Sequence, residues 1–112
     1  MIAYVIQGAI RKEDVLARFG GEEFVVLARE TGLAGAKALA ERIRRAVERS
    51  RCSFQGEELA VTVSVGVAAS AGPTELVALP SEQELLAAAD RALYRAKQAG
   101  RNCVVACTVG EE

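Results

Sequence analysis

Two adjacent carboxylates, Glu22 and Glu23, directly follow a pair of glycines, Gly20 and Gly21. Because glycine has no side chain, a ligand can approach the backbone closely at such a point. Carboxylate oxygens are the hard ligands that Mg²⁺ prefers, and Mg²⁺ commonly accompanies nucleotide phosphates. These residue types in this order allow a metal or nucleotide site, and they also allow a solvated acidic turn.

Two cations, Lys97 and Arg101, lie four residues apart on either side of a helix end expected at Gly100. Across such a helix end, their side chains could converge on one anion, for example a phosphate group. The alternative is that Lys97 is favoured by the helix dipole in the last turn and that Arg101 is a solvated charge.

The composition narrows the chemistry. The 112 residues contain no histidine, so a serine or cysteine hydrolase with an imidazole base is not expected. Catalysis would have to rest on carboxylates, cations and a bound metal. Cys52, Cys103 and Cys107 form no CxxC pair, which argues against a disulfide framework or a zinc site and favours free thiols in a reducing cytosol.

The charge balance and the first residues limit partners and location. A net charge of -1 gives no reason to expect a polyanion partner such as DNA or RNA. Residues 1–10 are fairly apolar, but they lack a basic flank and are too short to span a bilayer. We therefore expect a cytoplasmic chain without a signal peptide or membrane segment.

Hydrophobic periodicity predicts the elements that must position these residues. Apolar residues recur at helical spacing in two segments, and a third helix begins at a capping box formed by Ser81 and Glu84. Gly100 is the expected left-handed residue after that helix, and the polar stretch 55–58 is expected as a turn. The order is helix, hairpin, helix, strand, helix, strand, at residues 2–13, 15–19 with 24–28, 31–51, 61–68, 81–99 and 102–108.

This order predicts an α+β sandwich with helices packed on an antiparallel sheet. It resembles a ferredoxin-like β-α-β-β-α-β unit, of the kind found in nucleotide cyclases, whose opening strand is absent. In that layout the opening strand is central. Its absence would leave unpaired strand edges that must find a partner.

Four ordered motifs resemble one protein family. The stretch from Arg18 to Leu27 resembles the GGDEF signature in its GGEEF form. The segments 64–68, 89–102 and 11–14 resemble the family's S-[IV]-G-[IV]-A strand, its closing A-D-x-A-L-Y-x-A-K-x-x-G-R-N helix and turn, and its RxxD element. The chain thus resembles the GGDEF domain, the catalytic module of bacterial diguanylate cyclases, over almost its whole length.

The resemblance implies a role for each candidate residue. Gly20 and Gly21 would form the turn beside bound GTP, and Glu22 would bind the catalytic Mg²⁺ and help to deprotonate the attacking 3′-hydroxyl. Glu23 resembles a second acid needed for activity. Lys97 and Arg101 resemble the pair that contacts the GTP phosphates. Since each subunit would hold one GTP, two domains must meet, which implies a homodimer.

The RxxD element implies a second site. Arg11 and Asp14 resemble the family's inhibitory product site, where an arginine fork donates to a guanine edge and an aspartate accepts from it. The ligand there would be cyclic di-GMP. Taken from the residues alone, the pair is an ordinary charged helix end.

Two family segments do not occur in these 112 residues: an initial D-x-L-T-x-L-x-N-R-R run and a D-x-D-x-F-K-x-x-N-D run. In the family they supply another metal-binding aspartate and the residues that read guanine. We therefore expect residues 1–112 to be the C-terminal portion of a GGDEF domain, unable to make cyclic di-GMP alone. The alternatives are a non-catalytic module that binds cyclic di-GMP through Arg11 and Asp14, and a structural element stabilised by strand pairing with another copy.

Overall fold

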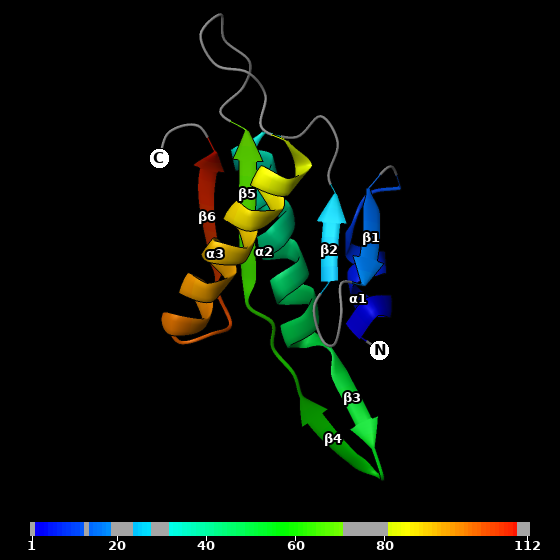
Figure 1. Cartoon of the computed structure of the whole chain (residues 1–112). Helices are drawn as coiled ribbons and strands as arrows, with labels where there is room; N and C mark the ends of the chain where they lie inside the picture. The colour runs from blue at the N-terminus through cyan, green and yellow to red at the C-terminus, as the bar shows by residue number, and fades with distance from the viewer. Residues whose placement is uncertain (1, 13, 19–23, 28–31, 71–80, 110–112) are drawn as a thin grey trace, which may run out of the picture.

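The computed structural model describes residues 2–12, 14–18, 24–27, 32–70 and 81–109. Within these ranges the chain is an α+β protein, as predicted, with three helices and six short strands (Figure 1). In chain order the elements are α1 (Ile2–Ala9), β1 (Val15–Arg18), β2 (Phe24–Leu27), α2 (Leu33–Arg49), β3 (Arg51–Phe54), β4 (Glu57–Ala60), β5 (Val65–Ser70), α3 (Glu82–Gln98) and β6 (Val104–Val109).

The strands form three two-stranded sheets within the described residues. β1 and β2 pair antiparallel, as predicted, and Arg18 pairs with Phe24 at the end of the ladder. β5 and β6 pair parallel, from Val65 with Val104 to Ser70 with Val109. The expectation of a wholly antiparallel sheet is therefore wrong. The reason is that α3 carries the chain back along the sheet, so β6 enters from the same end as β5.

A hairpin that the sequence did not predict follows α2. β3 and β4 pair antiparallel around Gln55 and Gly56, whose positive φ values of 52° and 83° form the two-residue turn. Figure 1 shows this hairpin projecting away from the helices. The predicted strand 61–68 begins too early, because residues 61–64 link the hairpin to β5 and belong to no ladder among the described residues.

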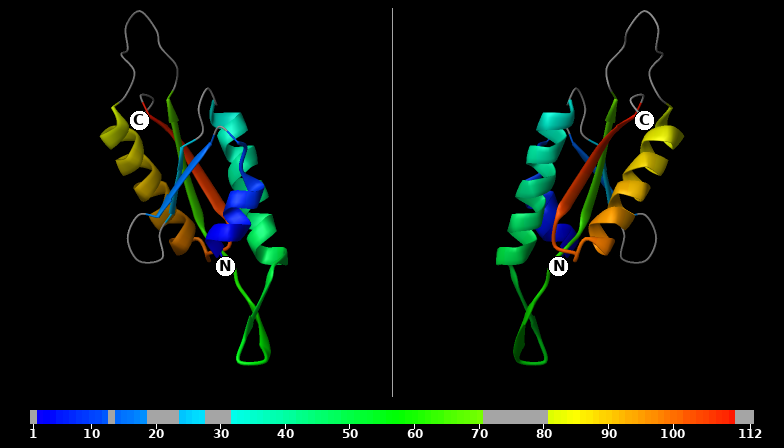
Figure 2. Two further views of the ribbon diagram at one scale, coloured as in Figure 1. Left: turned by 90° about the vertical axis from the view of Figure 1, so that its right-hand side faces the viewer. Right: turned by 90° about the vertical axis from the view of Figure 1, so that its left-hand side faces the viewer.

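Helices cover both faces of the β5–β6 pair. Figure 2 shows α3 on one side of these strands, and α2 with α1 on the other. On the α2 side, Leu39, Ile43 and Val47 form a buried cluster with Ile6 of α1, and Val47 is fully buried. Apolar side chains of the β1–β2 hairpin, including Phe24, pack against this cluster. The α1–α2 core thus holds the hairpin that carries the acidic motif.

On the other face, α3 lies unusually close to β5. Three alanines one helical turn apart, Ala88, Ala92 and Ala96, are fully buried. A Cβ atom placed on Gly66 of β5 would lie 2.2 Å from the backbone nitrogen of Leu93 and 2.3 Å from the carbonyl oxygen of Ala89. Small residues on both elements therefore permit the close approach that fixes α3, and with it the Lys97–Arg101 end, against the sheet.

Candidate functional site

The start and end of α3 follow the signals in the sequence. Ser81 Oγ accepts a hydrogen bond from the Glu84 N–H at 3.1 Å, and the Glu84 carboxylate accepts from the Ser81 N–H at 3.0 Å, which confirms the capping box. At the other end, Gly100 has a φ of 118°. The Arg101 N–H donates to the Ala96 carbonyl at 3.0 Å, and the Gly100 N–H donates to the Lys97 carbonyl at 3.4 Å, the two bonds of a Schellman motif.

Beyond this motif the backbone stays left-handed for two residues that are not glycine. Arg101 has a φ of 66° and Asn102 a φ of 48°. Asparagine tolerates this conformation, but for arginine it costs about 1–2 kcal/mol. Such a conformation persists only where surrounding contacts hold it in place.

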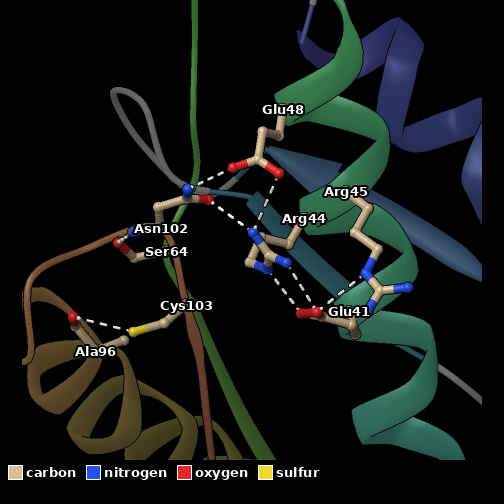
Figure 3. Close-up of polar contacts among 8 residues, drawn as sticks. All are labelled: Glu41, Arg44, Arg45, Glu48, Ser64, Ala96, Asn102 and Cys103. Atoms are coloured by element: carbon tan, nitrogen blue, oxygen red, sulfur yellow. Dashed lines mark hydrogen bonds and ion pairs between the residues drawn. The ribbon is translucent and has the colours of Figure 1, made fainter.

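Contacts of Asn102 supply that support (Figure 3). Its backbone N–H donates to Ser64 Oγ at 3.2 Å, and its side-chain Nδ2 donates to Glu48 Oε2 at 2.7 Å. Its Oδ1 accepts from Arg44 Nη1 at 3.0 Å. The turn after α3 is thereby tied both to α2 and to the segment that leads into β5.

Arg44 is itself held by acidic residues of α2. Its Nε and Nη2 donate to the two carboxylate oxygens of Glu41 at 2.6 and 2.8 Å, and its Nη1 lies 3.6 Å from Glu48 Oε1. Arg45 adds a 3.2 Å bond to Glu41. The hydrogen bonds from Arg44 lower the pKa of Glu41 from 4.5 to about 2. In turn, the carboxylates of Glu41 and Glu48 raise the pKa of Arg44.

A pH dependence of stability follows. Because Glu41 has a lower pKa when folded, its contribution to stability is complete above pH 4.5 and is lost as the pH falls towards about 2. Glu41→Gln removes this contribution, so the melting temperature should depend less steeply on pH across that window than in the unmodified chain. Glu57→Gln, at an exposed position outside these contacts, is the control. Parallel curves for Glu41→Gln and the unmodified chain would contradict the assignment.

The two candidate phosphate-binding residues, Lys97 and Arg101, lie at the C-terminal end of α3. Lys97 and Arg101 are both exposed, and neither makes an ion pair with any other residue that the structure describes. The C-terminus of α3, next to these residues, has a partial negative charge that stabilises nearby cations. The two charges are therefore available to an anion from solvent.

Gly20, Gly21, Glu22 and Glu23 lie outside the described residues, between the paired ends of β1 and β2. Figure 1 shows that the end of β1 and the start of β2 point towards the same end of the molecule as the C-terminus of α3. β1 thus ends, and β2 begins, towards the end of the molecule at which α3 has its C-terminus.

The donor chemistry of the acidic motif suits a hard divalent cation, because carboxylate oxygens are the ligands that Mg²⁺ prefers. Elsewhere, the residues that the structure describes include no group of three or more His, Cys, Asp or Glu side chains able to hold a metal. The assignment of Glu22 as a metal ligand remains a prediction from the sequence. In the same residues, no helix is long and apolar enough to cross a membrane.

Arg11 and Asp14 lie in direct contact after α1. Asp14 is buried, with 5% of its surface exposed, and its carboxylate accepts from the Arg11 N–H at 2.8 Å and from Arg11 Nε and Nη2 at 3.3 and 3.1 Å. These bonds lower the pKa of Asp14. The Arg11 side chain remains 41% exposed. The pair therefore closes a local turn and fixes an arginine at the surface, and its role as a product site remains a prediction.

Sequence reasoning missed the residues that hold the turn at Asn102. The sequence marks Asn102 only as part of the 89–102 motif, and Arg44 and Glu48 only as residues of the predicted helix 31–51. A usable signal was present: Glu41, Arg44 and Glu48 recur at intervals of three and four residues, which places three alternating charges on one stripe of α2.

Comparisons with known proteins agree on one family. The sequence profile described as "Diguanylate cyclase, GGDEF domain" matches residues 1–103. Diguanylate cyclase A of Treponema denticola is 40% identical over 103 residues, which are 92% of this chain and 26% of that protein. The response regulator PleD of Caulobacter vibrioides is 44% identical over 98 residues, which are 86% of this chain and 20% of that protein.

Solved structures agree with this. The diguanylate cyclase SiaD of Pseudomonas aeruginosa, solved with its activator SiaC, matches with a TM-score of 0.81 and 32% identity, over 95% of this chain and 38% of that one. The active GGEEF domain of a diguanylate cyclase from Vibrio cholerae matches with a TM-score of 0.75 and 28% identity, over 94% of this chain and 63% of that one. The chain therefore belongs to the GGDEF domain family of diguanylate cyclases.

Proposed function

We propose that residues 1–112 are the C-terminal portion of a diguanylate cyclase domain and bind GTP with Mg²⁺ at the end of the molecule where the Arg18–Phe24 end of the β1–β2 ladder and the C-terminus of α3 lie. The observation that carries this proposal is the common direction of these two ends (Figure 1). Family membership supports the substrate. The partial nature of the domain is supported by the two missing segments and by the 63% coverage of the Vibrio cholerae GGEEF domain chain.

In the proposed site, the residues have different tasks. Gly20 and Gly21 let the nucleotide approach the backbone, and Lys97 and Arg101 bind its phosphates. Glu22 would hold Mg²⁺ and would help to deprotonate the attacking 3′-hydroxyl, and Glu23 would be the second acid. Bound Mg²⁺ supplies neutralisation of phosphate charge, on which phosphoryl transfer depends more than on covalent help from the protein.

The overall reaction joins two GTP molecules. The 3′-oxygen of each GTP forms a bond to the α-phosphorus of the other, two pyrophosphates leave, and cyclic di-GMP results. Because each domain binds one GTP, the reaction needs two domains face to face, and we infer that a homodimer forms in the active state. A GTP-dependent reaction of this kind, and the free thiols of Cys103 and Cys107, favour a cytoplasmic location.

The direct test combines a binding and a turnover measurement on the purified chain. Calorimetric titration with GTP and MgCl₂ should show binding, and an assay of pyrophosphate release should show no turnover, because the segments that supply a further metal ligand and the guanine readers are missing. Absence of GTP binding would contradict the proposed site. Robust turnover by the chain alone would contradict the assignment as a partial domain.

A second candidate function is binding of cyclic di-GMP at Arg11 and Asp14. The observation that favours it is that 41% of the Arg11 side chain is exposed while the buried Asp14 carboxylate binds its Nε and Nη2 and so orients it. A planar arginine fork fixed in this way suits a guanine edge.

Replacing Arg11 by alanine should therefore weaken cyclic di-GMP binding by about tenfold or more, because charge-assisted hydrogen bonding from its guanidinium is lost. The measurement is calorimetric titration, and Lys12→Ala, which removes a neighbouring exposed charge, is the matched control. Equal affinities for the two variants, or no binding by the unmodified chain, would reject the product site.

A further inference from the structure

We propose that Asn102 is a positioning residue: contacts from α2 hold it, and it in turn holds Arg101 in the left-handed conformation that presents the Arg101 side chain beside Lys97 at the end of α3. The second part, presentation to the phosphates of GTP, rests on the proposed function. The first part concerns the conformation of the chain alone.

Arg101 is held on both of its sides. Its own N–H donates to the Ala96 carbonyl at 3.0 Å, which fixes the peptide plane before it. The residue after it, Asn102, is held by Ser64 Oγ at its N–H, at 3.2 Å, which fixes the peptide plane that joins the two residues. With both planes fixed, the φ of 66° at Arg101 is imposed by its neighbours.

The Asn102 side chain decides whether that arrangement persists. Its amide donates to Glu48 at 2.7 Å and accepts from Arg44 at 3.0 Å, so it uses a donor and an acceptor together (Figure 3). An asparagine also tolerates a positive φ better than most residues. Both properties are needed at this position, and few other side chains combine them.

The Arg44 side chain on α2 is held by contacts that do not involve Asn102. Only 15% of the Arg44 side chain is exposed, and Glu41 binds its Nε and Nη2, which leaves Nη1 directed at Asn102. These contacts are long-range: Glu48 and Asn102 are separated by 54 positions in the sequence, and Arg44 and Asn102 by 58 positions. A need for local helix stability would not explain such long-range bonds, whereas a need to place the turn after α3 does.

The experiment uses the ¹⁵N,¹³C-labelled chain and two matched variants. Arg44→Ala removes the guanidinium that donates to Asn102 Oδ1. Arg45→Ala removes a neighbouring arginine that, within these contacts, binds only Glu41. Backbone chemical shifts of residues 100–102, and their three-bond couplings between the preceding carbonyl carbon and Hα, report the left-handed conformation. Titration with GTP and MgCl₂ reports the affinity. Thermal unfolding of each variant is recorded alongside.

We expect Arg44→Ala to move the shifts and couplings of Arg101 and Asn102 towards averaged values and to weaken GTP binding by roughly tenfold, because a displaced ligand group loses most of its contribution. Arg45→Ala should leave the shifts unchanged and the affinity within about twofold. Unchanged shifts of residues 100–102 in Arg44→Ala would overturn the proposal.

A rescue pair guards against a variant that fails to fold. Asn102→Asp keeps the acceptor for Arg44 and the tolerance of positive φ, but it sets a carboxylate against Glu48 and should weaken GTP binding. Adding Glu48→Gln restores a donor to that carboxylate, and the double variant should return to within about twofold of the unmodified chain. A double variant no better than Asn102→Asp would also overturn the proposal.

Failure of this inference can be distinguished from failure of the proposed function. If Lys97→Ala and Arg101→Ala weaken GTP binding but Arg44→Ala changes neither shifts nor affinity, the phosphate site stands and the positioning role is wrong. If the unmodified chain binds no GTP, the proposed function is wrong, and the shifts and couplings in Arg44→Ala still decide whether Asn102 positions Arg101.

Discussion

Replacing Gly66 by alanine should lower the free energy of unfolding by about 3 kcal/mol or more. The added Cβ would lie 2.2 Å from the Leu93 nitrogen and 2.3 Å from the Ala89 oxygen. Both are backbone atoms of α3, so no side-chain rotation can relieve the clash. α3 would have to shift as a whole from β5. Urea unfolding followed by circular dichroism measures the loss.

Gly8→Ala is the matched control, because a Cβ at this helical position would meet nothing within 4 Å. Alanine should raise the stability of α1 by about 0.5–1 kcal/mol, since glycine in a helix costs about that much. A loss of less than about 1 kcal/mol for Gly66→Ala would mean that α3 does not lie as close to β5 as the structure has it.

The double variant Lys97→Ala with Arg101→Ala should weaken binding of GTP and Mg²⁺ by roughly 100-fold or more, because each cation makes a charge-assisted hydrogen bond to phosphate. The fold should be unaffected, since both side chains are exposed. Calorimetric titration at fixed ionic strength measures the change.

The control for this variant removes two positive charges elsewhere. Lys12 and Lys37 are exposed, and neither lies on α3. Replacing both by alanine should change the affinity by about threefold or less, because screened charges distant from the ligand contribute little. Equal losses in the two double variants would show that overall charge, rather than the end of α3, attracts the nucleotide.

Local signals predicted the second and third helices well, because their information lies within a few residues, whereas the first helix, predicted at 2–13, ends at Ala9. The capping box at Ser81 and Glu84 and the left-handed Gly100 are both confirmed. The predicted helix 31–51 is confirmed as α2, Leu33–Arg49, where the Ser50 N–H donates to the Ala46 and Val47 carbonyls. Helix ends are set by such neighbouring groups, which the sequence displays directly.

Strand pairing was predicted less well, because it depends on distant partners. The alternation of valines from Val61 to Val67 indicates which side chains share a face, but it does not say which of these residues pair with β6. Pairing begins at Val65, where the Val65 N–H donates to the Cys103 carbonyl at 2.9 Å. The β3–β4 hairpin is absent from the predicted elements, because the polar stretch 55–58 indicates a simple turn between a helix and a strand.

For the candidate site, the sequence predicted the groups but not what holds them. The spacing of Lys97 and Arg101 around Gly100 was enough to suggest a shared anion. The charged stripe on α2 marks Arg44 and Glu48, but their bonds to Asn102 join positions 44 and 48 to 102, so no local pattern identifies Asn102 as their partner. The roles of Glu22 and Glu23 remain predictions, because both residues lie outside the described part of the chain.

The central claim is that Glu22 and the Lys97–Arg101 end of α3 serve one nucleotide. Its most direct test is a nuclear magnetic resonance titration of the labelled chain with GTP and Mn²⁺ in place of Mg²⁺, since the paramagnetic ion broadens the signals of residues near it. The account predicts strong broadening at Glu22, Lys97 and Arg101 together, with the signal of Gln55 at the tip of the β3–β4 hairpin unchanged. Broadening at Glu22 alone, or at Lys97 and Arg101 alone, would contradict it.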